Sequence, residues 1–171
     1  MLDYIQLETF TSVWFWIFLA LTWSARSHWV LGVPFDAIVR ADRNPDKWGE
    51  AVDTLARVHA QRYCHVVDNV PITLVTLSAF TVGALGTASV IFWIDIAQAA
   101  FVIALPMMIV TWEDIRLARR VLRDELEGSP LRRVIVWRRF VVQLWGIASI
   151  SAAAGFLIFD VISRTGAEPI L

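Results

Sequence analysis

The order of apolar and charged positions divides the chain into long apolar stretches separated by charged connections. The uncharged runs cover residues 9–25, 69–94, 96–112 and 140–159. A helix needs about 20 apolar residues to cross the hydrocarbon core of a bilayer. Residues 69–112 contain a single charge, Asp95, over a length that suits two crossings. The pattern therefore predicts four membrane-spanning helices, near residues 8–31, 66–85, 90–112 and 137–161.

The two longer connections, residues 34–65 and 113–136, also carry helical patterns. In the first, Asn44 followed by Pro45 predicts a helix start, because asparagine caps helix N-termini and proline fits the first helical turn. We expect this helix to run into the second span with a bend at Pro71.

Small and helix-breaking residues predict where the spans turn. The cluster from Gly83 to Ser89 predicts the turn between the second and third spans. The third span is expected to continue beyond the membrane as far as Glu127, where the sequence Gly128-Ser129-Pro130 ends it.

Basic residues are concentrated in two connections. Residues 34–65 contain five, and residues 113–139 contain eight, of the 15 Lys and Arg residues. Basic loops of membrane proteins stay in the cytoplasm, so both termini are expected outside. The prediction is one all-α domain over residues 1–171, a four-helix transmembrane bundle with cytoplasmic helical extensions. Trp29, Trp112 and Trp137 fall at the predicted inner ends of the spans and Trp93 at an outer end, where tryptophan rings favour the membrane interface.

Composition narrows the class of protein. Hydrophobic residues make up 57% of the 171 residues and charged residues 18%, against about 25% charged in soluble domains. This excludes a disordered chain and an ordinary soluble enzyme. The single Cys excludes an internal disulfide, and the net charge of −1 argues against nucleic acid as a partner.

Ionisable and polar groups within spans are costly and are often functional. Asp95 is expected about 7 Å below the outer interface, with Gln98 one turn further on the same face, unless Asp95 stays wet or caps the helix. Arg26 is expected to pair with a carboxylate from Asp68 or Glu113, which would hold two helices together. The full set of intramembrane polar candidates is Arg26, His28, Asp68, Asp95, Gln98 and Glu113.

One group of residues could supply nitrogen, sulfur and oxygen ligands for a metal or haem, although the sequence signal is weak. Its members are His28, His59, Cys64, His65 and Asp68. The chain has neither C-x-x-C nor H-E-x-x-H, and an interfacial histidine bonded to a neighbour explains these residues better. We expect no cofactor and no catalytic residue, since no nucleophile or phosphate-binding motif is present.

The connection after the third predicted span is rich in arginine. Clusters of this kind beside membrane helices attract anionic lipid headgroups, or could dock an acidic partner. The candidates for lipid or partner docking are Arg116, Arg119, Arg120, Arg123, Arg132 and Arg133.

These features favour a non-enzymatic accessory or scaffold protein, a subunit or assembly partner of a larger complex. Its partners would be membrane lipids and another membrane or cytoplasmic protein, or a second copy of the chain. Two alternatives stay open: a small transporter or channel that uses Asp95 and Gln98, and a haem- or metal-binding membrane protein.

Two blocks of sequence resemble a known family. One runs from Phe10 to Trp16 and continues through Ser27-His28-Trp29-Val30-Leu31-Gly32-Val33-Pro34, and the other is Ala97-Gln98-Ala99 followed by Pro106-Met107. They are similar to short alphaproteobacterial membrane proteins that often carry the label "component of SufBCD complex". The resemblance covers about a quarter of the chain. It implies the bacterial inner membrane and association with the cytoplasmic iron–sulfur cluster assembly machinery. Together with the distribution of basic residues, it places both termini in the expected periplasm.

Overall fold

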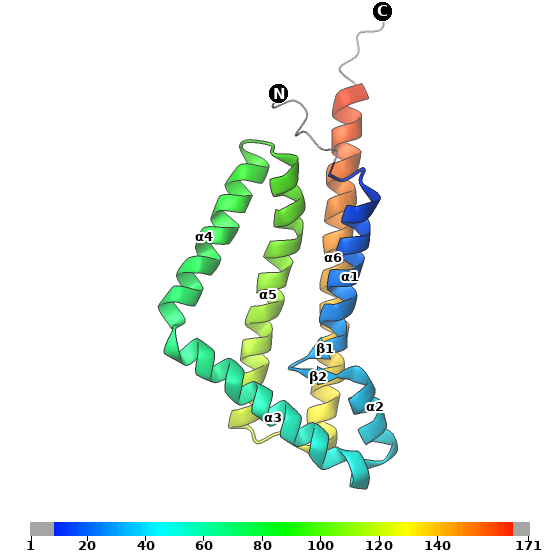
Figure 1. Cartoon of the computed structure of the whole chain (residues 1–171), viewed down its shortest axis with the longest axis vertical. Helices are drawn as coiled ribbons and strands as arrows, with labels where there is room; N and C mark the ends of the chain where they lie inside the picture. Colours follow the sequence, from blue (N-terminus) through cyan, green and yellow to red (C-terminus); the bar gives the residue numbers. More distant parts are fainter. Residues whose placement is uncertain (1–8, 166–171) are drawn as a thin grey trace, which may run out of the picture.

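The computed structural model describes residues 9–165 of the chain and is mostly helical, as predicted (Figure 1). Six helices and one two-stranded hairpin make up this part of the protein. In chain order they are α1 (Val13–His28), β1 (Trp29–Val30), β2 (Val33–Pro34), α2 (Phe35–Arg43), α3 (Pro45–Asn69), α4 (Pro71–Val90), α5 (Asp95–Arg123) and α6 (Gly128–Thr165).

Three of the described helices are long and apolar enough to cross a membrane. They are α4, α5 and the part of α6 from Gly128 to Phe159. The first predicted span, residues 8–31, is only partly realised, because α1 has 16 helical residues and is about 24 Å long. Residue 8 lies outside the described part of the chain. The structure therefore supports three spans, and the fourth remains a prediction.

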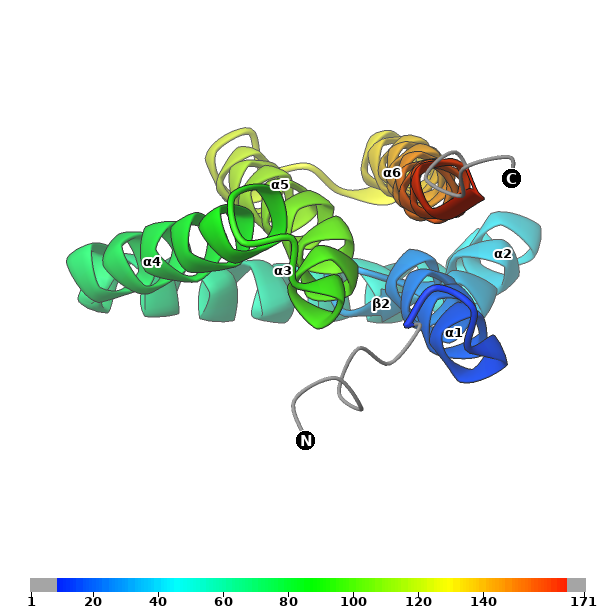
Figure 2. The same ribbon diagram turned by 90° about the horizontal axis from the view of Figure 1, so that it is seen from above.

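The long helices do not form a compact four-helix bundle. Helices α1 and α6 run side by side, α5 packs beside α6, and α4 lies on the far side of α5 (Figures 1 and 2). Ser89 is the one buried residue of α4. The apolar surface of α4 therefore has little protein around it, which suits a helix whose surroundings are lipid.

The turn between α4 and α5 lies later than the sequence predicted. Helix α4 continues through Gly83 and Gly86 to Val90, and the chain turns over residues 91–94. At Gly86, a Cβ atom would lie 3.2 Å from the ring of Phe101. This glycine therefore lets two helices approach closely and does not break the first of them. Trp93 supplies the turn, with a φ of 50°.

The helix start predicted at Asn44 and Pro45 is confirmed, since α3 begins at Pro45. The predicted bend at Pro71 is also present, as a full break between α3 and α4 at Val70. A residue before proline is pushed out of the helical region, and Val70 has a φ of −133° and a ψ of 48°. Helix α3 consequently crosses the base of the molecule obliquely while α4 rises along α5 (Figure 1).

Two boundaries around Gly128 were predicted wrongly. Helix α5 ends at Arg123 and not at Glu127, and Gly128 begins α6 and does not end a helix. The physical reason is local. Gly128 has a φ of 61°, and its N–H donates to the carboxylate of Asp53 from α3 over 2.8 Å. The charged connection and the last span are consequently one continuous helix.

Two separate hydrophobic cores hold the fold. The first, between the long helices, is built from Phe10, Phe15, Leu19, Trp23, Ala99, Val102, Val110, Val142 and Ala153. The second lies at the base, where the hairpin, α2 and α3 meet the ends of α5 and α6, and includes Val30, Leu31, Ile38, Val52, Ala56, Leu117, Val121, Leu131 and Ile135. We call the part of the protein around the second core the cap. Its own core makes it a packed unit.

Candidate functional site: a buried charge network between two cores

Three helices each place one charged residue between the two cores. On α5, Asp114 lies between Val110 of the first core and Leu117 of the cap. Each of these steps is three or four residues, so all three side chains share one face of the helix. The polar position therefore interrupts an otherwise apolar face.

The same arrangement recurs on α6. Arg138 lies between Ile135 of the cap core and Val142 of the first core. On the first helix, Arg26 follows Trp23 of the first core by three residues and is itself followed by the cap residue Val30. The three charged residues thus lie at one level of the molecule.

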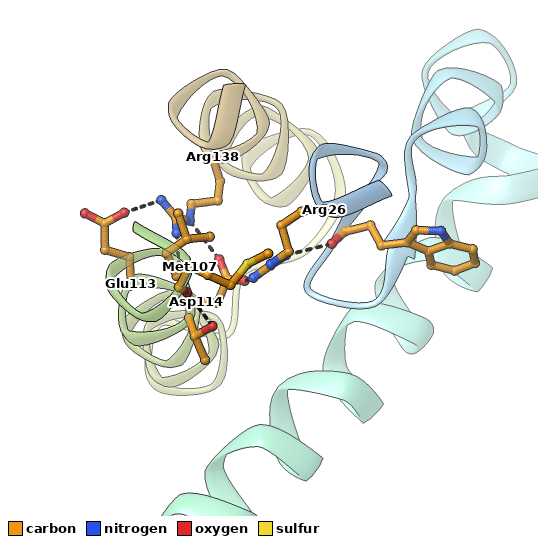
Figure 3. Close-up of polar contacts among 8 residues, drawn as sticks. Arg26, Met107, Glu113, Asp114 and Arg138 are labelled. Carbon is orange, nitrogen blue, oxygen red and sulfur yellow. Dashed lines mark hydrogen bonds and ion pairs between the residues drawn. The ribbon is translucent and has the colours of Figure 1, made fainter. Parts of the chain in front are cut away.

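Asp114 is fully buried, and both of its oxygens are engaged. Arg26 Nη2 donates to Oδ2, and Arg138 Nε donates to Oδ1 over 2.8 Å. Figure 3 shows the two arginines reaching the carboxylate from different helices. A buried carboxylate without partners is very costly, so the two guanidinium groups compensate its burial.

Arg138 is the most heavily bonded member of the network. It is 7% exposed, and besides Asp114 it bonds Glu113 through Nη1 and the carbonyl of Val110 through Nη2, over 2.7 Å in the latter case. Arg26 Nη1 donates to the carbonyl of Trp29 over 3.1 Å. Two arginines and two carboxylates balance in charge, and the network joins α1, α5 and α6.

The partner predicted for Arg26 was wrong, although its need for a carboxylate was right. Glu113 belongs to the same network but bonds Arg138. Asp68 lies elsewhere, on α3, and accepts a hydrogen bond from Arg119 over 3.1 Å. Sequence reasoning missed the role of Arg138, which it placed among the basic residues of the connection. The sequence does indicate this role, because Arg138 interrupts an apolar face formed by Ile135 and Val142 at helical spacing.

The weak metal-ligand candidates are dispersed. His28 lies 3.9 Å from Asp36, the ring of His59 faces Gly32, and His65 contacts the side chain of Asn69. Burial and the nearby Asp68 carboxylate raise the pKa of the Cys64 thiol. Within the described part of the chain, no three His, Cys, Asp or Glu side chains gather as a metal site would need.

Asp95 and Gln98 lie in the first turn of α5, at the opposite end of the spans from the cap. Asp95 is half-buried and is the first residue of α5, not five residues inside it. A carboxylate at this position interacts favourably with the helix dipole. Gln98 is 6% exposed, and its amide donates to the carbonyl of Ser89 over 3.2 Å. Gln98 therefore ties the end of α4 to α5.

The six arginines predicted to dock lipid or partner divide into two groups. Four are paired with carboxylates: Arg119 with Asp68, Arg120 and Arg123 with Asp124, and Arg132 with Asp42. The other two, Arg116 and Arg133, are exposed and have no ion pair among the described side chains. Arg116 instead lies over the ring of Trp112, 5.6 Å from its centroid.

The cap also carries a cleft of about 480 Å³ between the start of α3 and the start of α6. Asp53 lies in it and is half-buried. Its Oδ2 accepts the N–H of Gly128, while Oδ1 is buried and has no hydrogen-bond partner among the described residues. The residues that line the cleft are Pro45, Gly49, Glu50, Asp53, Thr54, Arg57, Glu127, Gly128 and Arg132.

Comparison of the chain with protein-family models, with curated proteins and with solved structures finds no match.

Proposed function

We propose that this protein is a non-enzymatic scaffold of the bacterial inner membrane, which holds its helical cap against the cytoplasmic face as a docking platform for a partner. The observation that carries the proposal is the charge network between the two cores. It fixes three helices at the level where the spans end and the cap begins.

The length of α5 supports this placement of the membrane. Asp95 and Asp114 are 19 residues apart on one helix, which corresponds to about 28 Å. That distance is close to the thickness of the hydrocarbon core of a bilayer, about 30 Å. The turn before α5 would lie at one face of the membrane and the charge network at the other.

Exposed tryptophans lie at the same two levels. Trp93, in the turn before α5, is 55% exposed, and Trp112 and Trp137, beside the network, are 46% and 65% exposed. Tryptophan rings favour the interface between lipid and water. In this frame α1, which runs beside α6, supplies the fourth crossing, with the turn at residues 9–12 completing its length.

The side on which the cap lies follows from charge. Thirteen of the 15 basic residues fall in residues 34–65 and 113–139, which include the cap. Loops rich in Lys and Arg are retained in the cytoplasm. The start of α1, the turn between α4 and α5 and the end of α6 lie at the opposite end of the molecule (Figure 1), on the side proposed to be periplasmic.

The cleft between the starts of α3 and α6 is the docking position that we propose for a partner. Its carboxylates Glu50, Asp53 and Glu127 outnumber its two arginines, and both arginines are paired, Arg57 with Glu127 and Arg132 with Asp42. The cleft therefore suits a basic segment of a partner protein, whose cationic side chain could bond Asp53 Oδ1 and Glu50.

Site-directed cross-linking in the native membrane tests the proposal. Thr54→Cys places a thiol in the cleft, and Ala51→Cys, on the same helix but outside the cleft lining, is the matched control; both carry Cys64→Ser. We expect a defined cross-linked partner from Thr54→Cys alone. Identical products from both positions, or none from either, would contradict a docking platform at this cleft.

Affinity purification in mild detergent through a C-terminal tag gives an independent readout. The sequence resemblance predicts that components of the iron–sulfur cluster assembly machinery co-purify. Recovery of the protein alone under conditions that preserve membrane complexes would count against an accessory role.

A further inference from the structure

Two helices present the same pair of residues as they pass the level of the charge network. On α5, the exposed Trp112 is followed one turn later by the exposed Arg116, and on α6 the exposed Arg133 precedes the exposed Trp137 by one turn. Because α5 leaves the spans and α6 enters them, the order reverses. In both helices the tryptophan lies on the apolar side and the arginine on the cap side.

We propose that these two Trp–Arg pairs bind the phosphate headgroups of anionic lipids in the leaflet that faces the cap. The inference concerns the lipid partner; it rests on the membrane placement proposed above and not on the scaffold function. A guanidinium group binds phosphate through two parallel hydrogen bonds, and a tryptophan one turn nearer the bilayer packs at the level of the lipid glycerol and upper acyl chain.

The ion pairs of the other arginines decide which residues take this role. Four of the six predicted docking arginines are held by carboxylates of this chain, whereas Arg116 and Arg133 have none among the described side chains. Their donors are available to an outside acceptor. The position of Arg116 over the Trp112 ring, 5.6 Å from its centroid, also orients it.

The amphipathic character of each pair favours a lipid over a free phosphate ion. Trp112 is 46% exposed and Trp137 is 65% exposed, and Phe140 extends the second apolar surface, with its ring centroid 5.6 Å from that of Trp137. A free phosphate would use the arginine alone. A phospholipid would also cover the rings, whose exposure to water is unfavourable.

Native mass spectrometry of the purified full chain tests the inference. The protein is titrated in detergent with phosphatidylglycerol, with phosphatidylcholine as the zwitterionic comparison. We expect preferential binding of phosphatidylglycerol, and about 5-fold weaker binding at each of the two sites for the double variant Arg116→Gln with Arg133→Gln, at one headgroup interaction per arginine. A matched double variant, Arg119→Gln with Arg123→Gln, removes the same charge from paired positions and should bind nearly as tightly as the wild type.

Equal losses in both double variants would show a general charge effect and overturn the two sites. Unchanged binding in the variant lacking Arg116 and Arg133 would also overturn them. Inorganic phosphate is the third arm. If it displaces the lipid at equal concentration, the rings contribute nothing and a lipid-specific site is wrong. Circular dichroism of each variant excludes loss of fold as the cause.

Discussion

Ser149 on α6 donates its hydroxyl to the carbonyl oxygen of Val102 on α5 over 2.7 Å, and both residues are buried. Pro106 lies four residues after Val102 inside the same helix, and proline has no N–H with which to reach that carbonyl. The neighbouring helix therefore supplies the hydrogen bond that α5 lacks. In a bilayer, where no water can replace it, this bond fixes how α6 is placed against α5.

We expect Ser149→Ala to lower the free energy of unfolding by about 1–2 kcal/mol, because it leaves the Val102 carbonyl without a donor in the apolar core. Pro106→Ala restores the backbone N–H, so the same Ser149→Ala change should cost clearly less in that background. Unfolding in mixed micelles, followed by tryptophan fluorescence, measures both costs. Equal losses in the two backgrounds would show that Ser149 does not compensate for Pro106, and would contradict the explanation.

The order of residues along α5 determines which of them share a face but not what they contact. Val110, Asp114 and Leu117 follow helical spacing, so their common face could be read from the order of residues. The pairing of Asp114 with Arg26 and Arg138 depends on the rotation and height of three helices relative to one another. Nothing in the spacing within one helix determines these, which is why the sequence favoured Asp68 or Glu113 as the partner of Arg26.

Removal of the Asp114 charge, at the centre of the network, should strongly destabilise the protein. Asp114→Asn preserves the shape of the side chain but leaves two arginines without their shared counter-charge. A buried pair that loses one partner typically costs about 3–5 kcal/mol. We expect a loss of this size in the free energy of unfolding, measured in mixed micelles by circular dichroism.

The double variant Asp114→Leu with Arg138→Met should be less destabilised than Asp114→Asn alone. It removes a charge of each sign and leaves apolar side chains between two apolar cores. Arg26 retains 17% side-chain exposure and Glu113 retains 34%, so both can reorient towards water. A double variant as unstable as the single one would show that the network gives specificity that apolar packing cannot replace.

The hairpin after α1 was not predicted, because the expected helix ran through it to residue 31. It is only two residue pairs long, with Trp29 opposite Pro34 and Val30 opposite Val33. Such short strands leave no alternating pattern in the sequence. The turn residues Leu31 and Gly32 both have positive φ, 51° and 70°, and burial of Leu31 in the cap core offsets the strain.

Gly32→Ala should destabilise the cap through two separable effects. A Cβ atom there would lie 2.3 Å from the ring of His59, and the φ of 70° is unfavourable for alanine. His59→Ala removes the collision but not the backbone strain, so we expect it to rescue Gly32→Ala only in part. Thermal unfolding of the four proteins gives the coupling, and independent effects of the two changes would contradict this contact.

The reactivity of Cys64 with a thiol reagent should report the ion pair between Asp68 and Arg119. Burial and the Asp68 charge raise the pKa of the Cys64 thiol, while Arg119 lowers it. A raised pKa means less thiolate at a given pH, so the pH midpoint of alkylation by iodoacetamide should lie above that of a free cysteine. Asp68→Asn removes a raising charge and should shift the midpoint down, and Arg119→Gln should shift it up. The two variants also control for each other, because both break the ion pair between Asp68 and Arg119. A general opening of the contact between α3 and α5 would therefore move both pH midpoints in the same direction. Shifts of the same sign would therefore contradict the electrostatic explanation, whereas opposite shifts support it.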